Sequence, residues 1–104
     1  APFIYTGFKP AFVMIKSSTY AESWYINDSK RSATGGTNPN HAYLLPNDSA
    51  AEGTSTSLKI DLLSNGFKLQ NNDTSYNKNT QTYIYMAFAE EPLVATNGVA
   101  ATAR

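Results

Sequence analysis

The sequence predicts an all-β fold, an antiparallel β-sandwich or jelly-roll of about seven short strands with long polar loops. Apolar residues alternate over short distances, and no segment of eleven or more residues repeats them at the helical spacing of 3.6. The apolar runs are rich in aromatic and β-branched residues, and Gly, Pro, Asn, Asp or Ser bounds each of them. With 104 residues, the chain is long enough for one domain with a modest core.

The individual runs predict where the strands lie. The run at 11–17 follows a turn built on Gly7 and Pro10, and it is apolar on both faces. A later run carries Trp24 and Tyr25, which strand alternation places on opposite faces. We expect strands at residues 2–6, 11–17, 23–28, 41–45, 57–63, 66–71 and 81–90.

Residues 58–70 predict a hairpin between two of these strands. Apolar residues alternate with charged or polar ones on both sides of the pair Asn65-Gly66. Both residues of this pair tolerate a positive φ, which the tight turn of a hairpin favours. The alternation predicts that one face of the hairpin is buried and the other faces water.

Residues 82–90, TYIYMAFAE, differ from the hairpin because both faces of the run are apolar. Tyrosine and alanine fall on one side, and larger aliphatic and aromatic residues fall on the other. This pattern is typical of a central strand that is covered on both faces. We therefore predict a core between two sheets that contains Phe67 and is built over Phe12, Ile84, Met86 and Phe88.

Long polar stretches separate the predicted strands, at 29–40, 46–57 and 71–81. Each is longer than an ordinary connection, and loops of this length are commonly functional. We expect them to project outward as a contact surface. Residues 1–91 are predicted to form the domain, and residues 92–104 a tail that packs loosely or against a neighbouring subunit.

Composition argues against several classes of function. The chain has no cysteine, which excludes disulfides and thiolate metal sites and fits a reducing cytoplasm or a particle assembled there. Eight basic residues balance eight acidic ones, and Lys30-Arg31 is the one adjacent basic pair, so we expect no nucleic-acid partner. No apolar run is long enough for insertion into a membrane.

Residues suited to catalysis are scarce, and we predict that the protein is not an enzyme. His41 is the only histidine, and no G-x-S-x-G nucleophile motif accompanies it. Glu90 and Glu91 are adjacent, so alternation points them to opposite sides of a strand end. A glycosidase needs two carboxyl groups that face each other, and a small glycan-processing domain is therefore only the second alternative.

Calcium is the one cofactor that the sequence leaves open. Asp48, Glu52 and Asp73 offer carboxylate oxygens in polar loops, and calcium prefers such ligands. None of them lies in an EF-hand loop, and aspartate in loops commonly forms turns by bonding its own backbone. We expect no bound cofactor, with calcium as the alternative.

Aromatic residues beside polar loops are the best candidates for ligand binding. Such rings stack on sugars or pack in protein interfaces, while amide and carboxylate groups orient hydroxyls. The alternative for each aromatic residue is a place at the rim of the core. The candidate ligand-binding residues are Trp24, Tyr20, Tyr43, Tyr76, His41, Asn72 and Asp73.

Several stretches resemble, in the same order, a small C-terminal β domain of structural proteins from marine tailed phages. They are YTGFKPAFVMIK at 5–16, WYINDSKR at 24–31, PNDSAAEGTSTSL at 46–58, SNGFKL at 64–69, TYIYMAFAE at 82–90 and ATAR at 101–104. The resemblance implies a lectin-like sandwich in a tail-fibre or host-adhesion protein of the virion, assembled in the host cytoplasm. It also implies a homotrimer, and it carries over no catalytic or ligand-binding residues.

We therefore expect a non-catalytic, virion-associated module that binds a host surface glycan or an outer-membrane protein through its loops. The alternative is a structural trimerisation or capping domain whose aromatic residues pack against sister subunits. Exposed strand edges invite pairing of this kind.

Overall fold

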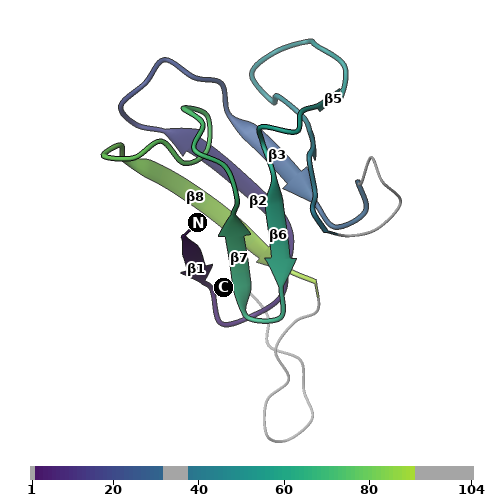
Figure 1. Cartoon of the computed structure of the whole chain (residues 1–104). Coiled ribbons are helices and arrows are strands. Elements are labelled where there is room, and N and C mark those ends of the chain that lie inside the picture. Colours follow the sequence, from purple (N-terminus) through teal and green to yellow (C-terminus); the bar gives the residue numbers. More distant parts are fainter. Residues whose placement is uncertain (1, 32–37, 91–104) are drawn as a thin grey trace, which may run out of the picture.

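Eight strands and the loops between them make up the part of the chain that is described in a computed structural model, residues 2–31 and 38–90 (Figure 1). These residues contain no helix, and therefore no helix that could cross a membrane. The predicted all-β class is confirmed. The strands are β1 (Phe3–Tyr5), β2 (Pro10–Ser17), β3 (Tyr25–Asp28), β4 (Ala42–Tyr43), β5 (Gly53–Thr54), β6 (Ile60–Leu63), β7 (Gly66–Leu69) and β8 (Tyr83–Ala89). The predicted tail, 92–104, lies outside the described residues.

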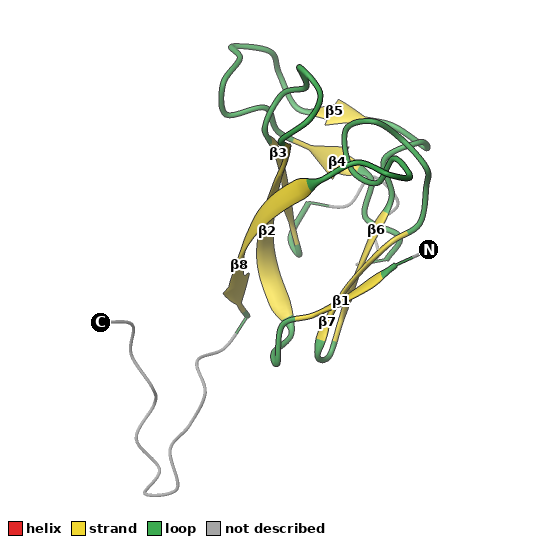
Figure 2. Ribbon diagram, turned by 90° about the vertical axis from the view of Figure 1, so that its left-hand side faces the viewer, coloured by secondary structure: helices red, strands yellow, loops and turns green. Residues whose placement is uncertain are grey.

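Two antiparallel three-stranded sheets face each other and form the sandwich (Figure 2). The first has the order β1-β7-β6 and the second β3-β2-β8, while β4 and β5 form a small ladder at one end. Seven strands overlap the predicted ones, whereas β5 falls in the predicted loop 46–57. Its two residues carry no apolar pattern, and a Cβ at Gly53 would lie 2.6 Å from Cζ of Tyr43, so the Tyr43 ring would have to shift.

Residues that alternate inward from both sheets fill the core. Val13 and Ile15 of β2 meet the inward side chains of β6 and β7, among them Phe67, as predicted. The buried hydrophobic cluster consists of Val13, Ile15, Leu58, Ile60, Leu62, Phe67, Leu69 and Tyr76. The predicted core over Phe12, Ile84, Met86 and Phe88 is wrong, because these side chains lie on the other face of the β3-β2-β8 sheet.

β8 is an edge strand and not the central strand that its sequence predicted. It pairs with β2 along its length, from Ser17↔Tyr83 to Pro10↔Ala89, and ends the sheet. β2 takes the central place, between β3 and β8. Separately, the described residues do not cover the apolar outer face of β8.

The predicted hairpin is confirmed, but its glycine serves a different purpose from the one expected. β6 and β7 pair antiparallel from Ile60↔Leu69 to Leu63↔Gly66. Gly66 does not have a positive φ. Among the glycines in the described part of the chain, the one with a positive φ is Gly7 (φ 80°). Gly66 instead allows the close approach of β1, since a Cβ at this position would lie 2.1 Å from the carbonyl oxygen of Ile4.

The segment 38–44 joins the two sheets along one side of the sandwich. Asn40 exchanges backbone hydrogen bonds of 2.8 and 2.9 Å with Ile60 of β6, and Leu44 exchanges bonds of 2.9 and 3.0 Å with Ile26 of β3. The side-chain amide of Asn38 bonds the backbone N–H and C=O of Leu62 at 2.8 and 3.0 Å. The outer edges of β3 and β6 are thereby partly covered.

Candidate functional site

The most unusual surface of the molecule is the outer face of β2 and β8. Its apolar side chains are paired across the two strands, Phe12 with Phe88 and Met14 with Met86, and Ile84 is their neighbour on β8. Ile84, Met86 and Phe88 expose 52%, 48% and 55% of their surface, and the rings of Phe12 and Phe88 meet edge to face at 5.5 Å. We call these five residues the outer apolar face.

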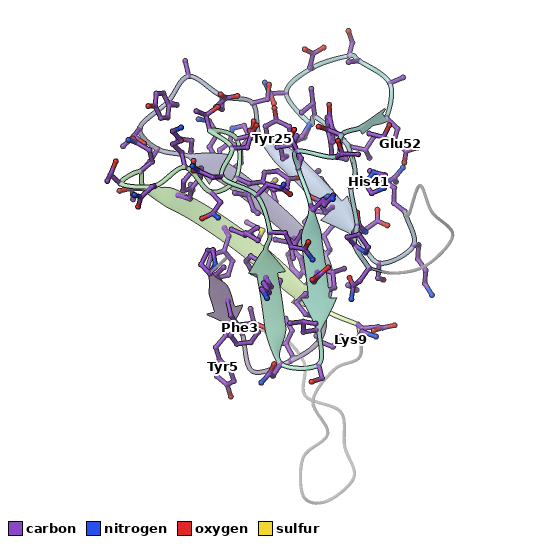
Figure 3. All side chains as sticks on the ribbon, viewed as in Figure 1. Phe3, Tyr5, Lys9, Tyr25, His41 and Glu52 are labelled. Atoms are coloured by element: carbon purple, nitrogen blue, oxygen red, sulfur yellow. The ribbon has the colours of Figure 1, made fainter. Side chains whose placement is uncertain are left out.

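The solvent side of an antiparallel sheet is ordinarily polar, which makes the outer apolar face exceptional. The opposite sheet gives the contrast within the same molecule. There, Phe3 of β1 is also exposed, but it lies beside Lys68 of β7, which is paired with Asp61 of β6. Figure 3 shows Phe3 and the exposed Tyr5 together on β1. The outer apolar face has five adjacent apolar side chains, and its charged neighbours lie at the margins, Lys16 opposite Ile84 and Asp28 opposite Phe12.

Tyr76, one of the predicted ligand-binding residues, lies in the core and not on the loop surface. Its side chain is 2% exposed and belongs to the core cluster. The phenol donates a hydrogen bond to Oδ1 of Asn27, which is itself fully buried. The loop 71–81 thus folds back onto the sandwich around Tyr76, instead of projecting outward as its polar sequence suggested.

A polar network fastens the same loop to β3 and β8. The Glu22 carboxylate accepts hydrogen bonds from Thr74 at 2.6 Å and Ser75 at 3.3 Å, and the Tyr83 hydroxyl donates to the carbonyl of Thr74 at 2.8 Å. Ser75 also bonds the hydroxyl of Tyr25 at 3.1 Å. Burial raises the pKa of Tyr25 and of Tyr83 above the ordinary value of 10.0. These phenols therefore remain neutral and hold the loop by hydrogen bonds.

The other aromatic candidates are spread over different parts of the molecule. Tyr43 is half-buried, with its ring 5.3 Å from that of Tyr25, which in turn lies 5.4 Å from Tyr76. Tyr43 and Tyr76 are thus brought together across Tyr25, inside the fold and not on a binding surface. Tyr20 is 42% exposed, and Trp24 is half-buried with its backbone N–H bonded to Asn47.

The polar candidates likewise do not converge with these rings. His41 is half-buried beside β4, and none of the described residues forms a hydrogen bond with its Nδ1 (Figure 3). Asn72 accepts a bond from the backbone of Asn79 at 3.1 Å, and Asp73 accepts one from the backbone of Ser75 at 2.9 Å. Both contacts lie within the loop, and the seven predicted ligand residues do not gather at one place in the described part of the chain.

The three calcium candidates are also separated. Asp48 bonds the backbone N–H of Ala50 at 2.9 Å, Glu52 pairs with Arg31, and Asp73 lies in the other loop. Within residues 2–31 and 38–90, no three His, Cys, Asp or Glu side chains gather as metal ligands do. Asp48 and Asp73 each accept a backbone hydrogen bond from two residues along the chain, which is turn chemistry, whereas Glu52 forms an ion pair.

A polar groove of about 660 Å³ lies beside β3, and a charged cluster forms part of its wall. Arg31 bonds the carboxylates of Asp28 at 3.0 Å and Glu52 at 2.7 Å. The hydrogen bond that Arg31 donates to Glu52 is the main cause that raises the pKa of Arg31. Glu90 pairs with Lys9 at 3.3 Å, and Glu91 lies outside the described residues. Asp28, Arg31, Glu52 and Glu90, which line this groove, are therefore already engaged in ion pairs.

The sequence held the signal for the outer apolar face, but that signal was interpreted as burial. YIYMAFA in β8 is apolar on both faces, which indicates that both faces are covered. The sequence could not indicate whether the cover comes from the same chain or from another molecule. In the structure, no described residue covers the apolar side chains on the outer face of β8, so the outer apolar face is the candidate functional site.

Comparisons with known proteins place the chain in a family. No curated protein matched the sequence, and no solved structure matched it. One family profile, described as Domain of unknown function (DUF7483), matches residues 1–92. Because the match covers most of the 104 residues, the chain belongs to the DUF7483 family.

Proposed function

We propose that this domain is a non-catalytic assembly module of a phage virion protein, which self-associates through β8 and the outer apolar face. The resemblance to phage structural proteins supports the virion part of the proposal. The assembly part is carried by one observation, the half-exposed row of Ile84, Met86 and Phe88 on an edge strand. Of the two functions expected from the sequence, sister-subunit packing thus has more support than host binding through loops.

The size of the outer apolar face suits a protein interface. A large side chain presents on the order of 200 Å² when fully exposed, so three half-exposed ones present roughly 300 Å². Phe12 and Met14 add part of their surface to this patch. A standard interface buries about 800 Å² on each partner, of which about 57% is apolar. The outer apolar face would supply most of that apolar share, and patches of this size on monomers are often functional.

Sedimentation of the wild-type chain and of the double variant Ile84→Ser/Phe88→Ser tests the proposal. We expect the wild type to sediment as an oligomer and the variant as a single chain. The variant should fold, because both replaced side chains are half exposed within one chain. Phe3→Ser is the matched control, since Phe3 is 46% exposed on the opposite sheet and its loss should leave the oligomer intact. A wild type that stays monomeric at high concentration would refute self-association.

A further inference from the structure

We infer that two copies of the chain pair through the free edges of their β8 strands, antiparallel and about a twofold axis at Met86. The inference rests on the proposed function and specifies how the copies meet. Pairing of this kind joins the two β3-β2-β8 sheets into one sheet of six strands. Its basis is the backbone of β8, the sequence of β8 and the register that the two together favour.

The backbone of β8 has unused hydrogen-bonding groups along its outer edge. In an antiparallel ladder, hydrogen-bonded and non-hydrogen-bonded pairs alternate. Ser18 donates its backbone N–H to the carbonyl of Thr82 at 3.0 Å, which marks this pair as hydrogen-bonded. Every second residue from Thr82 onward along β8 therefore directs its backbone N–H and C=O toward β2. The residues between them, Tyr83, Tyr85 and Ala87, direct these groups away from β2. No described residue forms a backbone hydrogen bond with them on that side.

β8 also lacks the features that keep an edge strand from pairing. The edges of β3 and β6 are partly covered by the segment 38–44, and β1 has only three residues. β8 has seven residues, with no charge and no proline among them. Long, uncharged, apolar edges without such protection pair readily with another strand. Among the described strands, β8 is therefore the one best suited to pair with a second copy.

The register follows from pairing the whole of β8 with itself. Antiparallel pairing of all seven residues places Met86 opposite the partner's Met86, at a non-hydrogen-bonded pair. Tyr85 and Ala87, whose backbones face the free edge, then form the hydrogen-bonded pairs with the partner strand. On the outer face, Ile84 lies opposite the partner's Phe88, so each apolar side chain gains an apolar neighbour across the strands.

The inner face fits the same register. Tyr85 lies opposite the partner's Ala87, and Tyr83 opposite the partner's Ala89, so each large ring meets a small side chain. Tyr85 is 49% exposed in the single chain, although its ring packs edge to face on Phe67 at 5.2 Å. A shift of the partner by two residues would instead place Tyr85 opposite the partner's Tyr85. The register centred on Met86 thus satisfies both faces of β8.

Single-cysteine variants of the full chain test this register, because the natural sequence has no cysteine. Non-hydrogen-bonded antiparallel pairs have Cα atoms about 4.5 Å apart, within the range of about 4.4–6.8 Å that a disulfide spans. Met86→Cys should shift from the mass of one chain to that of two on a non-reducing gel, and reductant should reverse the shift. Ile84→Cys and Phe88→Cys are the matched controls. Neither should crosslink alone, but a mixture of the two should crosslink.

Sedimentation of the wild type separates this inference from the proposed function. A mass of two chains together with the expected crosslinking pattern supports the β8 pair. A mass of two chains in which Met86→Cys crosslinks no faster than Ile84→Cys would overturn the pairing and leave self-association in place. A mass of three chains would likewise overturn the twofold pair and support the trimer implied by the phage resemblance. A single-chain mass at every concentration would overturn both.

Discussion

Replacing Tyr76 with phenylalanine removes one hydroxyl from the core and leaves the ring in place. The hydroxyl is the hydrogen-bond donor to Oδ1 of Asn27, whose amide nitrogen is bonded to Asn40 at 3.3 Å and to the carbonyl of Ala42 at 3.0 Å. Because Asn27 is fully buried, water cannot replace the lost donor. Leaving a buried acceptor without a partner costs about 1–3 kcal/mol.

We therefore expect Tyr76→Phe to lower the free energy of unfolding by about 2 kcal/mol, which for a domain of this size lowers Tm by roughly 10 °C. Urea unfolding followed by the fluorescence of Trp24 measures the first quantity, and circular dichroism measures the second. Tyr20→Phe is the control, since Tyr20 is 42% exposed and its hydroxyl can bond water. If the two variants were equally stable, the buried Tyr76–Asn27 bond would not hold loop 71–81 in place.

Two further predictions concern the same fold. Gly66→Ala should lower the free energy of unfolding, measured by urea titration, by about 1–3 kcal/mol. The new Cβ would lie 2.1 Å from the Ile4 carbonyl oxygen, so β1 would have to move. The control is Ser64→Ala in the exposed turn beside Gly66, which should have little effect in the same titration. Burial raises the pKa of Tyr76 above 10.0, so the folded state holds the phenolic proton more tightly than the unfolded state. This contribution is complete below pH 10 and is lost as the pH rises above 10, at about 1.4 kcal/mol per pH unit. Tyr76→Phe should remove that part of the slope, and an unchanged slope would contradict the assignment.

Local patterns were enough to predict seven of the eight described strands. The alternation around Asn65-Gly66 correctly predicted the β6–β7 hairpin, and the runs at 11–17 and 81–90 correctly predicted β2 and β8. These features depend on residues close in sequence, where the period of two is a direct physical signal. The small β5 strand has no such pattern and was missed.

The errors concern the placement of segments that are distant in sequence. β8 was assigned to the centre of a sheet because both of its faces are apolar, but a strand's place in a sheet depends on which other strands reach it. Tyr76 lies in a polar stretch, and its own neighbours give no sign that it enters the core. Only the network around Glu22 and Asn27, more than 45 residues away, brings it there.

The pairing of β2 with β8 has a consequence for how the chain folds. Its partners, such as Phe12 and Phe88, come from opposite ends of the domain, so the central strand of this sheet lacks one neighbour until the last strand has been synthesised. Closing so long a loop is entropically costly, and folds dominated by distant contacts form slowly. The β6–β7 hairpin can form early on the ribosome, whereas a nascent chain that stops before β8 would leave Val13 and Ile15 without their last cover. Completion of the sandwich therefore waits for the synthesis of β8.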